Sequence, residues 1–487
     1  MHRTALPTIT TRQPPRRRLR LLGLILAAAL TLALSPAAHA DQVLLMHPDG
    51  RVSRVENRFV SGAAKPQPKP KPKPKAESAP VSVSGLLPRL VKQGTPYLRE
   101  WNAALSTQKH LSGTRAAELG DVISLVKGLA AKGQLTANRL PVLFLTLARN
   151  TQWWKSGALP SPGQRIQFSG SQLVWQYYPG QGLQLQVLGT FGEANGLYEA
   201  GPASYPKLTA LLAEMTPLAV HRGGGLAWEY YFNFDGGRPP WVSAMSQATG
   251  IEAFTNAYQA THNRSYLNTA HQALGILQTA PPDGVEVKSP SGVRFLQYSF
   301  QPRNEIINAF LQTLIGLNTY AQVSGDPVAQ RLFAAGNSQA QADLPAFNTG
   351  SWSLYQPGEE DPLNYHQLVT GFLQTLCKQT GAAPYCNTAQ AFAADLSAPP
   401  KLALTTTRAA KQKPFHLRFK LNKPAHVGVI LASTKSHKTY LSTSSESSPG
   451  TDFWQTPKLP AGTYTVELSA TDQAGNHASI SPTLTVK

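Results

Sequence analysis

The sequence predicts a multidomain, mainly α-helical protein that ends in a separate all-β module. Three observations support this prediction: a length of 487 residues, helical spacing of apolar residues through the middle of the chain, and two-residue alternation after Pro399 and Pro400. Because a chain of this length exceeds one ordinary hydrophobic core, we expect two or more domains.

The first 40 residues are typical of a secretory signal peptide. A basic stretch at residues 16–20 precedes an apolar run at residues 21–34, and the sequence Pro-Ala-Ala-His-Ala follows at residues 36–40. The apolar run is shorter than the roughly 20 residues that span a membrane, so we expect cleavage rather than a retained anchor. Paired arginines leave both the general secretory and the twin-arginine routes open. We expect a secreted or extracytoplasmic protein. Association with the cell envelope is one form that this location could take.

The positive charge of the chain is concentrated near its N-terminus. Removal of the six arginines in residues 1–40 takes the formal net charge from +19 to +13, and five lysines lie in the Lys/Pro-rich residues 63–80. That composition predicts an extended, semi-rigid linker, which acts either as a spacer alone or as a contact with an anionic cell envelope. The rest of the chain is only mildly basic, which argues against a dedicated nucleic-acid-binding protein.

A short β segment is expected at residues 41–62. Two apolar stretches flank His47-Pro48-Asp49-Gly50, which is a turn sequence, so the segment predicts a small hairpin. A hairpin of this length is too short to fold alone.

Residues 81–398 are predicted to form a large helical domain. Apolar residues recur at helical spacing from about residue 85 to residue 150, and alternation between residues 165 and about 200 predicts a β insert. Further helices are expected at residues 207–220, 242–261, 265–279, 304–324, 326–344, 365–380 and 388–396. Successive helices with short loops favour an α/α toroid or incomplete barrel, in which helix ends and loops surround a cleft.

Cys377 and Cys386 are the two cysteines of the chain. They flank a turn-like sequence, and in an oxidising compartment we expect them to form a disulfide. No clustered ligands accompany them in the sequence, so a metal site there is not expected.

Residues 401–487 are expected to form a β-sandwich. The alternation in His416-Leu417-Arg418-Phe419 is typical of strands with one buried face. The ending from Gly462 to Asn476 resembles bacterial immunoglobulin-like and fibronectin type III-like modules, although the paired cysteines of antibody domains are missing. That resemblance implies a spacer or adhesion element rather than a catalytic unit.

Three segments of the helical region combine aromatic residues with Arg, Asn and Gln: residues 228–241, 297–308 and 348–366. Aromatic rings stack on the C–H faces of sugars, while polar neighbours bind hydroxyl and carboxylate groups. The alternative is that these aromatics only pack the core. The histidines are scattered, Gly223-Gly224-Gly225 lacks the Lys of a phosphate-binding loop, and no nucleophile elbow is present. We therefore expect neither a metal nor an organic cofactor.

In their order and spacing these segments make residues 228–396 resemble the C-terminal domain of the D-glucuronyl C5-epimerases. The matching stretches are residues 241–247, residues 298–317, residues 348–355 and Asn364-Tyr365-His366. Enzymes of that family invert C5 of glucuronic acid to give iduronic acid within a polysaccharide. The resemblance implies a secreted isomerase whose partner is a polysaccharide that contains uronic acid.

The resemblance also implies which residues form the site. The catalytic tyrosines of the family correspond to Tyr298, Tyr355 and Tyr365, and a substrate-contacting asparagine corresponds to Asn308. We expect Tyr365 and Tyr355 to act as acid and base, with Tyr298 as the third candidate, because a positioned phenol can donate or accept a proton. Other candidate substrate-binding residues, including two arginines available to pair a carboxylate, are Arg238, Trp241, Gln297, Arg303 and His366.

Two positions depart from the family pattern. Gln297 stands where the family has a glutamate that is implicated in proton transfer, and residues 356–360 lack an arginine that the family carries there. Since an amide is not a general base, two alternatives to an epimerase remain: a non-catalytic glycan-binding protein with a degenerate cleft, and a polysaccharide lyase that begins with the same proton abstraction.

Overall fold

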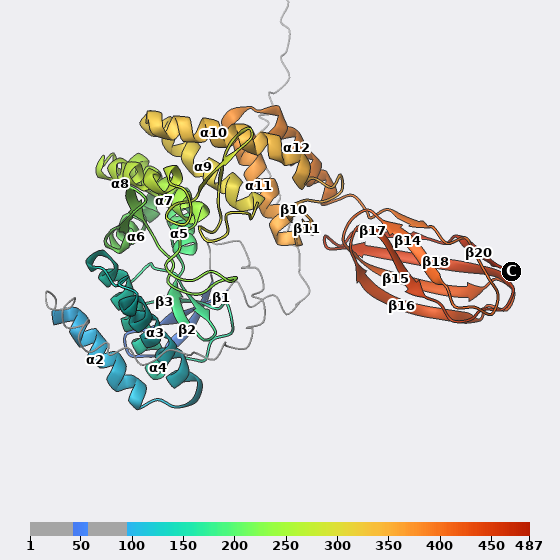
Figure 1. Cartoon of the computed structure of the whole chain (residues 1–487), viewed down its shortest axis with the longest axis horizontal. Helices are drawn as coiled ribbons and strands as arrows, with labels where there is room; N and C mark the ends of the chain where they lie inside the picture. The colour runs from blue at the N-terminus through green and yellow to red at the C-terminus, as the bar shows by residue number, and fades with distance from the viewer. Residues whose placement is uncertain (1–41, 57–94) are drawn as a thin grey trace, which may run out of the picture. The chain divides into compact units, whose positions relative to one another are not determined.

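The computed structural model describes residues 42–56 and 95–487 (Figure 1). The expected signal peptide and the Lys/Pro-rich linker lie outside the described residues. Within the described part of the chain, the helices are too short or too polar to cross a membrane.

The N-terminal hairpin is part of a larger sheet. Five strands adopt the order β2-β1-β3-β4-β5, and β1 runs parallel to β3 while the other neighbours are antiparallel. These strands are β1 (Gln42–Met46), β2 (Val52–Glu56), β3 (Arg165–Phe168), β4 (Trp175–Tyr178) and β5 (Gly182–Leu185). Helix α4 contacts α2 and α3, and both α3 and α4 contact β5; their bounds are α2 (Thr95–Lys109), α3 (Gly113–Ala131) and α4 (Leu140–Ser156).

The predicted β insert ends earlier than expected. Alternation was expected up to about residue 200, but the last strand ends at Leu185 and helix α5 spans Val187–Glu199. The physical reason is that Phe191, Ala194 and Leu197 are buried at helical spacing, which places them on one face of a helix.

Four helical hairpins follow one another in the described chain, and a short β-hairpin leads into each (Figure 1). The first helices are α5, α7 (Ala244–Thr261), α9 (Ile307–Ser324) and α11 (Leu363–Thr380), and the second helices are α6 (Tyr205–Met215), α8 (Ser265–Ala273), α10 (Pro327–Asp343) and α12 (Ala383–Asp395). The leading hairpins are β4–β5, β6 (Val220–Arg222)–β7 (Gly225–Ala227), β8 (Glu286–Ser289)–β9 (Gly292–Phe295) and β10 (Leu354–Gln356)–β11 (Glu359–Glu360). Short 3₁₀ helices span Ala137–Arg139, Pro202–Ser204, Thr216–Leu218, Leu274–Gln278 and Leu344–Phe347.

The first helices form a row. Helix α7 packs between α5 and α9, α9 packs against α11, and each second helix packs against the first helix of its own hairpin. Loops at residues 228–243 and 296–306 separate two of these hairpins from α7 and α9. Residues from the N-terminal ends of all four first helices pack in one group, so these ends come together at one end of the row. The contacts describe a row of hairpins, and closure into an α/α toroid stays a prediction.

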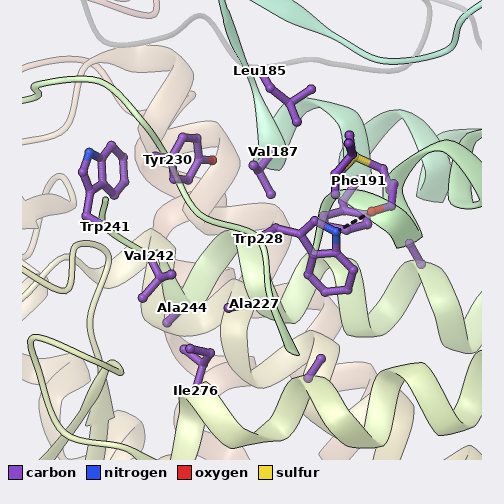
Figure 2. Close-up of a cluster of buried hydrophobic side chains, with 14 of the residues drawn as sticks. Leu185, Val187, Phe191, Ala227, Trp228, Tyr230, Trp241, Val242, Ala244 and Ile276 are labelled. Atoms are coloured by element: carbon purple, nitrogen blue, oxygen red, sulfur yellow. Dashed lines mark hydrogen bonds between the residues drawn. The ribbon is translucent and has the colours of Figure 1, made fainter. Parts of the chain in front are cut away.

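Two glycines allow the row to pack closely. A Cβ atom on Gly250 of α7 would lie 2.7 Å from the ring of Phe191 on α5, and one on Gly316 of α9 would lie 2.3 Å from the carbonyl oxygen of Ala248 on α7. Figure 2 shows the resulting core, in which Trp228 packs against Phe191 with ring centroids 4.8 Å apart and its Nε1 donates to the carbonyl oxygen of Met215 at 2.9 Å.

A buried ion cluster fixes the aromatic segment at residues 228–241. Glu229 accepts hydrogen bonds from Arg139 at 2.8 Å, from Arg222 at 2.7 Å and from the hydroxyl of Tyr231 at 2.7 Å. Burial alone would raise the pKa of Glu229, but the bonds from Arg139 and its other partners outweigh burial and lower that pKa. The carboxylate is therefore a structural anchor between two distant parts of the chain.

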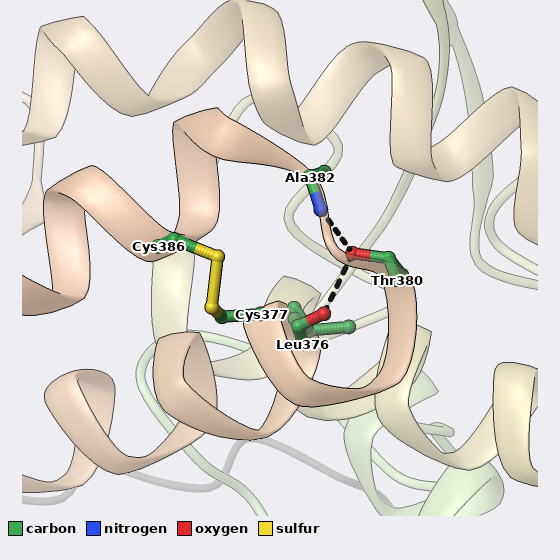
Figure 3. The surroundings of a disulfide bond; sticks show 5 residues. All are labelled: Leu376, Cys377, Thr380, Ala382 and Cys386. Atoms are coloured by element: carbon green, nitrogen blue, oxygen red, sulfur yellow. Dashed lines mark hydrogen bonds between the residues drawn. A yellow bond between two sulfur atoms is a disulfide. The ribbon is translucent and has the colours of Figure 1, made fainter.

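The predicted disulfide is present (Figure 3). Cys377 near the end of α11 is bonded to Cys386 on α12, and Thr380 between them donates to the carbonyl oxygen of Leu376 at 2.6 Å. Helix α12 begins at Ala383 rather than at Thr388, because Pro384 suits the first turn of a helix.

The C-terminal part of the chain contains two sheets that share one hydrophobic core. A three-stranded sheet has the order β12-β14-β17, and a six-stranded sheet has the order β13-β20-β18-β15-β16 with β19 paired to β18. Their bounds are β12 (Leu402–Leu404), β13 (Arg408–Ala409), β14 (His416–Leu421), β15 (Ala425–Ser433), β16 (Thr439–Ser447), β17 (Gly450–Gln455), β18 (Gly462–Asp472), β19 (His477–Ile480) and β20 (Thr483–Val486). This agrees with the predicted β-rich region, and its immunoglobulin-like character stays a prediction.

Candidate functional site

The three tyrosines singled out from the sequence lie together. Tyr355 and Tyr365 contact edge to face with ring centroids 5.5 Å apart, and Tyr298 packs against the same small apolar group. Tyr298 comes from the loop before α9, Tyr355 from β10, and Tyr365 from the first turn of α11. We call these three residues, with Gln297 and Asn308, the tyrosine cluster.

The hydrogen bonds within the cluster distinguish Tyr298 from Tyr355. Burial raises the pKa of both phenols above the usual value of 10. Bonds from Gln297 and Tyr355 act in the opposite direction on the pKa of Tyr298, whereas the bond with Tyr298 raises the pKa of Tyr355 further. Since a hydrogen bond donated to the charged form favours ionisation, Tyr298 is the easier of the two to ionise.

Two residues that directly precede Tyr298 and Ala309 of this group in the sequence have amide oxygens without a partner. Oε1 of Gln297 and Oδ1 of Asn308 are both buried and accept no hydrogen bond, and the Asn308 side chain is only 5% exposed. A buried acceptor without a donor costs on the order of 1–3 kcal/mol, so such groups need an explanation. A ligand that donates hydrogen bonds would satisfy both.

The cluster lies where the N-terminal ends of the row of first helices meet. Tyr355 packs with Met245 from the start of α7 and with Ile306 and Ala309 around the start of α9, and Leu188 and Tyr365 from the starts of α5 and α11 pack against the same group. Helix N-termini carry partial positive charge, which favours a bound anion. The surroundings are therefore suited to a ligand with both hydroxyl and carboxylate groups.

Trp241 supports the cluster instead of exposing a stacking surface. Its side chain is 4% exposed, its ring stacks on Tyr230 at 4.2 Å, and its edge contacts the ring of Tyr298 at 5.6 Å. Nε1 of Trp241 donates to the carbonyl oxygen of Phe232 at 2.8 Å. We infer that Trp241 orients Tyr298, and its predicted contact with substrate stays a prediction.

The structure does not support the prediction that His366 binds substrate. Its side chain is fully buried and stacks on Trp352 with ring centroids 3.9 Å apart. Its Nε2 donates to the carbonyl oxygen of Phe392 at 3.0 Å, and its Nδ1 accepts from the backbone N–H of Ser353 at 3.2 Å. With both ring nitrogens used, His366 has no group left to bind a substrate.

Ser353 extends the buried hydrogen bonds around His366. Oγ of Ser353 lies 2.8 Å from Nδ1 of His366 and donates to Asp361 at 2.6 Å, and Trp352 donates to the carbonyl oxygen of Asp361 at 2.7 Å. We call Trp352, Ser353, Asp361 and His366 the His366 cluster. Its serine, histidine and carboxylate do not form a nucleophilic triad, because all three side chains are buried.

The two predicted arginines are not buried. Arg238 and Arg303 are exposed on the loops before α7 and α9. Their predicted pairing with a substrate carboxylate stays a prediction. Arg294 is the partly buried arginine of the same loop region, but Asp343 at 2.7 Å and Glu305 already pair with it beside a small pocket lined by Phe310 and Phe347.

Gln186, which the sequence did not single out, also reaches this region. The hydroxyl of Tyr230 donates to Gln186 at 3.1 Å, accepts from the backbone N–H of Leu188 at 3.0 Å and lies 2.7 Å from Ser246. Gln186 in turn donates to the hydroxyl of Tyr178 at 3.1 Å. No local signal marks Gln186, because its role depends on the packing of α5 beside α7.

Metal ligands do not converge near the tyrosines. Among residues 42–56 and 95–487, no group of three or more His, Cys, Asp or Glu side chains is placed to hold a metal ion. The chemistry available to the described cluster is therefore that of phenols, amides and helix N-termini.

Comparisons with known proteins agree with the resemblance predicted from the sequence. A family model described as the D-glucuronyl C5-epimerase C-terminus matches residues 223–394. A D-glucuronyl C5-epimerase of Caenorhabditis elegans is 31% identical over 130 residues, which cover 24% of this chain and 21% of that protein. An uncharacterized protein of Methanocaldococcus jannaschii is 25% identical over 168 residues, which cover 33% of this chain and 54% of that protein.

These similarities concern part of each protein. The chain spans about a fifth and about half of the lengths of these two relatives. A solved structure of cellobiose 2-epimerase from Bacillus thermoamylovorans has 15% identity and a TM-score of 0.31 over 43% of this chain and 58% of its own, which is too low to support an inference. Tyr298, Tyr355 and Tyr365 all lie within the stretch that the family model matches. Residues 223–394 of this chain are therefore similar to the C-terminal region of the D-glucuronyl C5-epimerases.

Proposed function

We propose that the protein is an isomerase that inverts C5 of uronic acid residues within a polysaccharide. One observation carries the proposal: three phenols pack together at the N-terminal ends of the first helices. Gln297 and Asn308, from the same segments of the chain, each have a buried amide oxygen without a partner. The match of residues 223–394 to the D-glucuronyl C5-epimerase family model supports an isomerase-type enzyme, and the choice of polymer rests on the chemistry of the cluster.

The tyrosine cluster has partners for each group of a uronate ring. Hydroxyl groups of the sugar would donate to Oε1 of Gln297 and Oδ1 of Asn308, which would remove the cost of leaving these buried acceptors unsatisfied. The carboxylate would lie toward the helix N-termini, whose partial positive charge favours an anion. Arg238 and Arg303 are candidates to add charge from the surrounding loops.

The proposed reaction removes and returns one proton. A phenolate takes the proton from C5, and the electron pair of the broken C–H bond moves into the carboxylate as an enolate-like intermediate. A phenol on the opposite face of the ring then gives a proton to C5, which completes the inversion. Neither step requires a metal or an organic cofactor, since both are general acid–base chemistry.

We assign the two faces to Tyr298 and Tyr365. Gln297 and Tyr355 oppose the rise that burial causes in the pKa of Tyr298, whereas Tyr298 adds to the rise in the pKa of Tyr355, so the phenolate of Tyr298 is the easier of the two to form. Tyr355 is then a positioning residue, and Tyr365, whose ring contacts that of Tyr355, is the second acid or base. This changes the pairing expected from sequence, in which Tyr355 was the partner of Tyr365.

Hydrogen exchange in heavy water tests this function. The full protein is incubated with candidate uronic-acid polymers, and deuterium at C5 is measured by NMR together with the ratio of the two epimers. We expect both exchange and inversion. A polymer that binds in the cleft but shows no exchange would establish a glycan-binding protein instead, an alternative that Gln297 in place of the family glutamate favours.

The lyase alternative has a separate signature. If the C4 oxygen leaves after proton abstraction, the product contains a C4–C5 double bond and absorbs ultraviolet light. We expect no increase in that absorbance while inversion proceeds.

We also propose that the protein is exported, on the basis of the N-terminal sequence. The mature chain would begin at Asp41, directly after the small-residue motif. N-terminal sequencing of the protein from the extracytoplasmic fraction tests this proposal, and a chain that retains residues 1–40 there would contradict it.

A further inference from the structure

The outer face of the three-stranded C-terminal sheet carries an exposed aromatic ring among basic residues. Along β14, His416, Arg418 and Lys420 point outward while the leucine and phenylalanine positions between them are buried. On the neighbouring strand β17, Phe453 pairs directly with Arg418 and is 45% exposed.

The basic side chains hold the Phe453 ring in place. The imidazole of His416 stacks on it with ring centroids 4.2 Å apart, and the guanidinium of Arg418 lies 5.5 Å from its centroid. A ring fixed by two neighbours loses less conformational freedom when a ligand stacks on it. The remaining exposed surface of Phe453 is therefore a preorganised platform beside a cation.

The face has a uniform sign of charge. The outward positions of β12, β14 and β17 carry Arg418 and Lys420 and no carboxylate, because Asp452 is half-buried and accepts a hydrogen bond from Ser447. An acidic polymer would meet no repulsion across these three strands.

The six-stranded sheet of the same module differs from the three-stranded sheet in the charge around its exposed apolar side chain. Its exposed hydrophobic residue, Ile430 at 42% exposure, pairs with Glu467, and its His426 is bonded to Glu446 at 2.8 Å. The two faces thus have an equally exposed apolar side chain, but only one surrounds it with uncompensated positive charge.

We propose that the outer face of β12, β14 and β17 binds an acidic polysaccharide, with a sugar ring stacked on Phe453 and its carboxylate paired with Arg418. Aromatic faces suit the C–H face of a sugar, and the planar guanidinium suits a carboxylate. Lys420 lies further along the same strand and pairs with a second acidic residue of the polymer. This site is separate from the tyrosine cluster and requires no catalysis, so it goes beyond the proposed function.

Affinity electrophoresis of the full chain through gels that contain polymer tests the proposal. The probes are alginate and polygalacturonate, with dextran as a neutral polysaccharide and polyglutamate as a polyanion without sugar rings. We expect Phe453→Ala and Arg418→Gln each to weaken binding of the two acidic polysaccharides about tenfold, which corresponds to one lost stacking or charge-assisted contact of ordinary strength. The matched controls are Ile430→Ala and Lys438→Gln on the other sheet, which should bind as the unsubstituted protein does.

The outcomes separate this proposal from the proposed function. Weakened binding in the Phe453 and Arg418 variants, with unchanged C5 exchange on a short uronate oligosaccharide, supports the second site whether or not the enzyme proposal holds. Equal binding by all four variants overturns it. So does polyglutamate binding that responds to Phe453→Ala as strongly as alginate binding does, because the stacking on a sugar would then contribute nothing.

Discussion

The tyrosine cluster and the His366 cluster take residues from the same short segments of the chain, but they differ in how their buried polar groups are hydrogen-bonded. Ser353 belongs to the His366 cluster, and Tyr355, two residues later, belongs to the tyrosine cluster. His366 belongs to the former and its neighbour Tyr365 to the latter. Both nitrogens of His366 have protein partners. In the tyrosine cluster, Gln297 and Asn308 each retain a buried oxygen without a partner.

The difference between the ring nitrogens of His366 and the amide oxygens of Gln297 and Asn308 indicates what these residues contribute. Buried polar groups that satisfy one another stabilise a unique fold, whereas buried groups that remain unsatisfied cost stability unless a ligand completes them. We therefore expect changes in the His366 cluster to reduce stability and changes in the tyrosine cluster to reduce activity at nearly constant stability.

The largest effect should follow from Tyr365→Phe. Loss of one acid–base group should lower the rate of inversion by about 10³-fold, within the usual range for general acid–base catalysis. Because Tyr298 remains, one of the two epimers should still exchange its C5 hydrogen with solvent without inverting. NMR in heavy water, started from each epimer separately, measures both quantities. Inversion at the unsubstituted rate would remove Tyr365 from the mechanism.

The next effect should be a loss of stability in His366→Ala. This change leaves a cavity beside Trp352 and removes two hydrogen bonds from the buried ring, so we expect the free energy of unfolding to fall by about 3 kcal/mol. Urea unfolding followed by tryptophan fluorescence measures it, with Gln367→Ala, an exposed neighbour, as the control. A loss of activity without a loss of stability would restore His366 to the substrate site.

The His366 cluster should also make stability depend on pH. Burial lowers the pKa of His366 from 6.5 to about 4, and the ammonium of Lys423 adds to this lowering. The stabilising effect of the neutral ring is complete above pH 6.5 and is lost as the pH falls toward 4, because the unfolded chain then binds a proton that the folded chain does not. The slope should be about 1.4 kcal/mol per pH unit in that window.

A His366→Leu variant isolates that slope. Burial raises the pKa of Glu252 to about 7, so Glu252 contributes a slope of the opposite sign in both proteins. The difference between the two unfolding free energies, measured from pH 7.5 to 4, therefore reports His366. A difference that stays constant with pH would contradict the buried neutral ring.

The smallest effect should come from Gln297→Glu, and its sign is informative. A carboxylate beside Tyr298 would replace a hydrogen-bond donor with a negative charge and raise the pKa of the phenol, so we expect inversion to slow about tenfold and its optimum to move to higher pH. Gln272→Glu on α8, at an exposed position, controls for the added charge. An increase in activity would show that the chain lacks a base that the glutamate restores.

Several features could be predicted from the sequence because they depend on local pattern or on matching motifs. Helical spacing located the hairpins that carry Asn308 and Tyr365, and motif order identified the three tyrosines that the fold brings together. Cys377 and Cys386 were paired correctly because they are the two cysteines of the chain. The end of the β insert was placed too late, since a few residues of alternation do not define where the following helix begins.

The remaining features depended on contacts between distant segments. His366 and Tyr365 are adjacent in sequence, but successive residues of a helix point in different directions, so one packs against Trp352 and the other reaches the tyrosine cluster. Likewise, β1 pairs with β3 across more than a hundred residues of intervening chain. The sequence by itself determined which segments form helices and which phenols are available. Only the tertiary structure decided which polar groups satisfy one another and which remain for a ligand, because hydrogen bonding between distant residues follows from packing and not from local order.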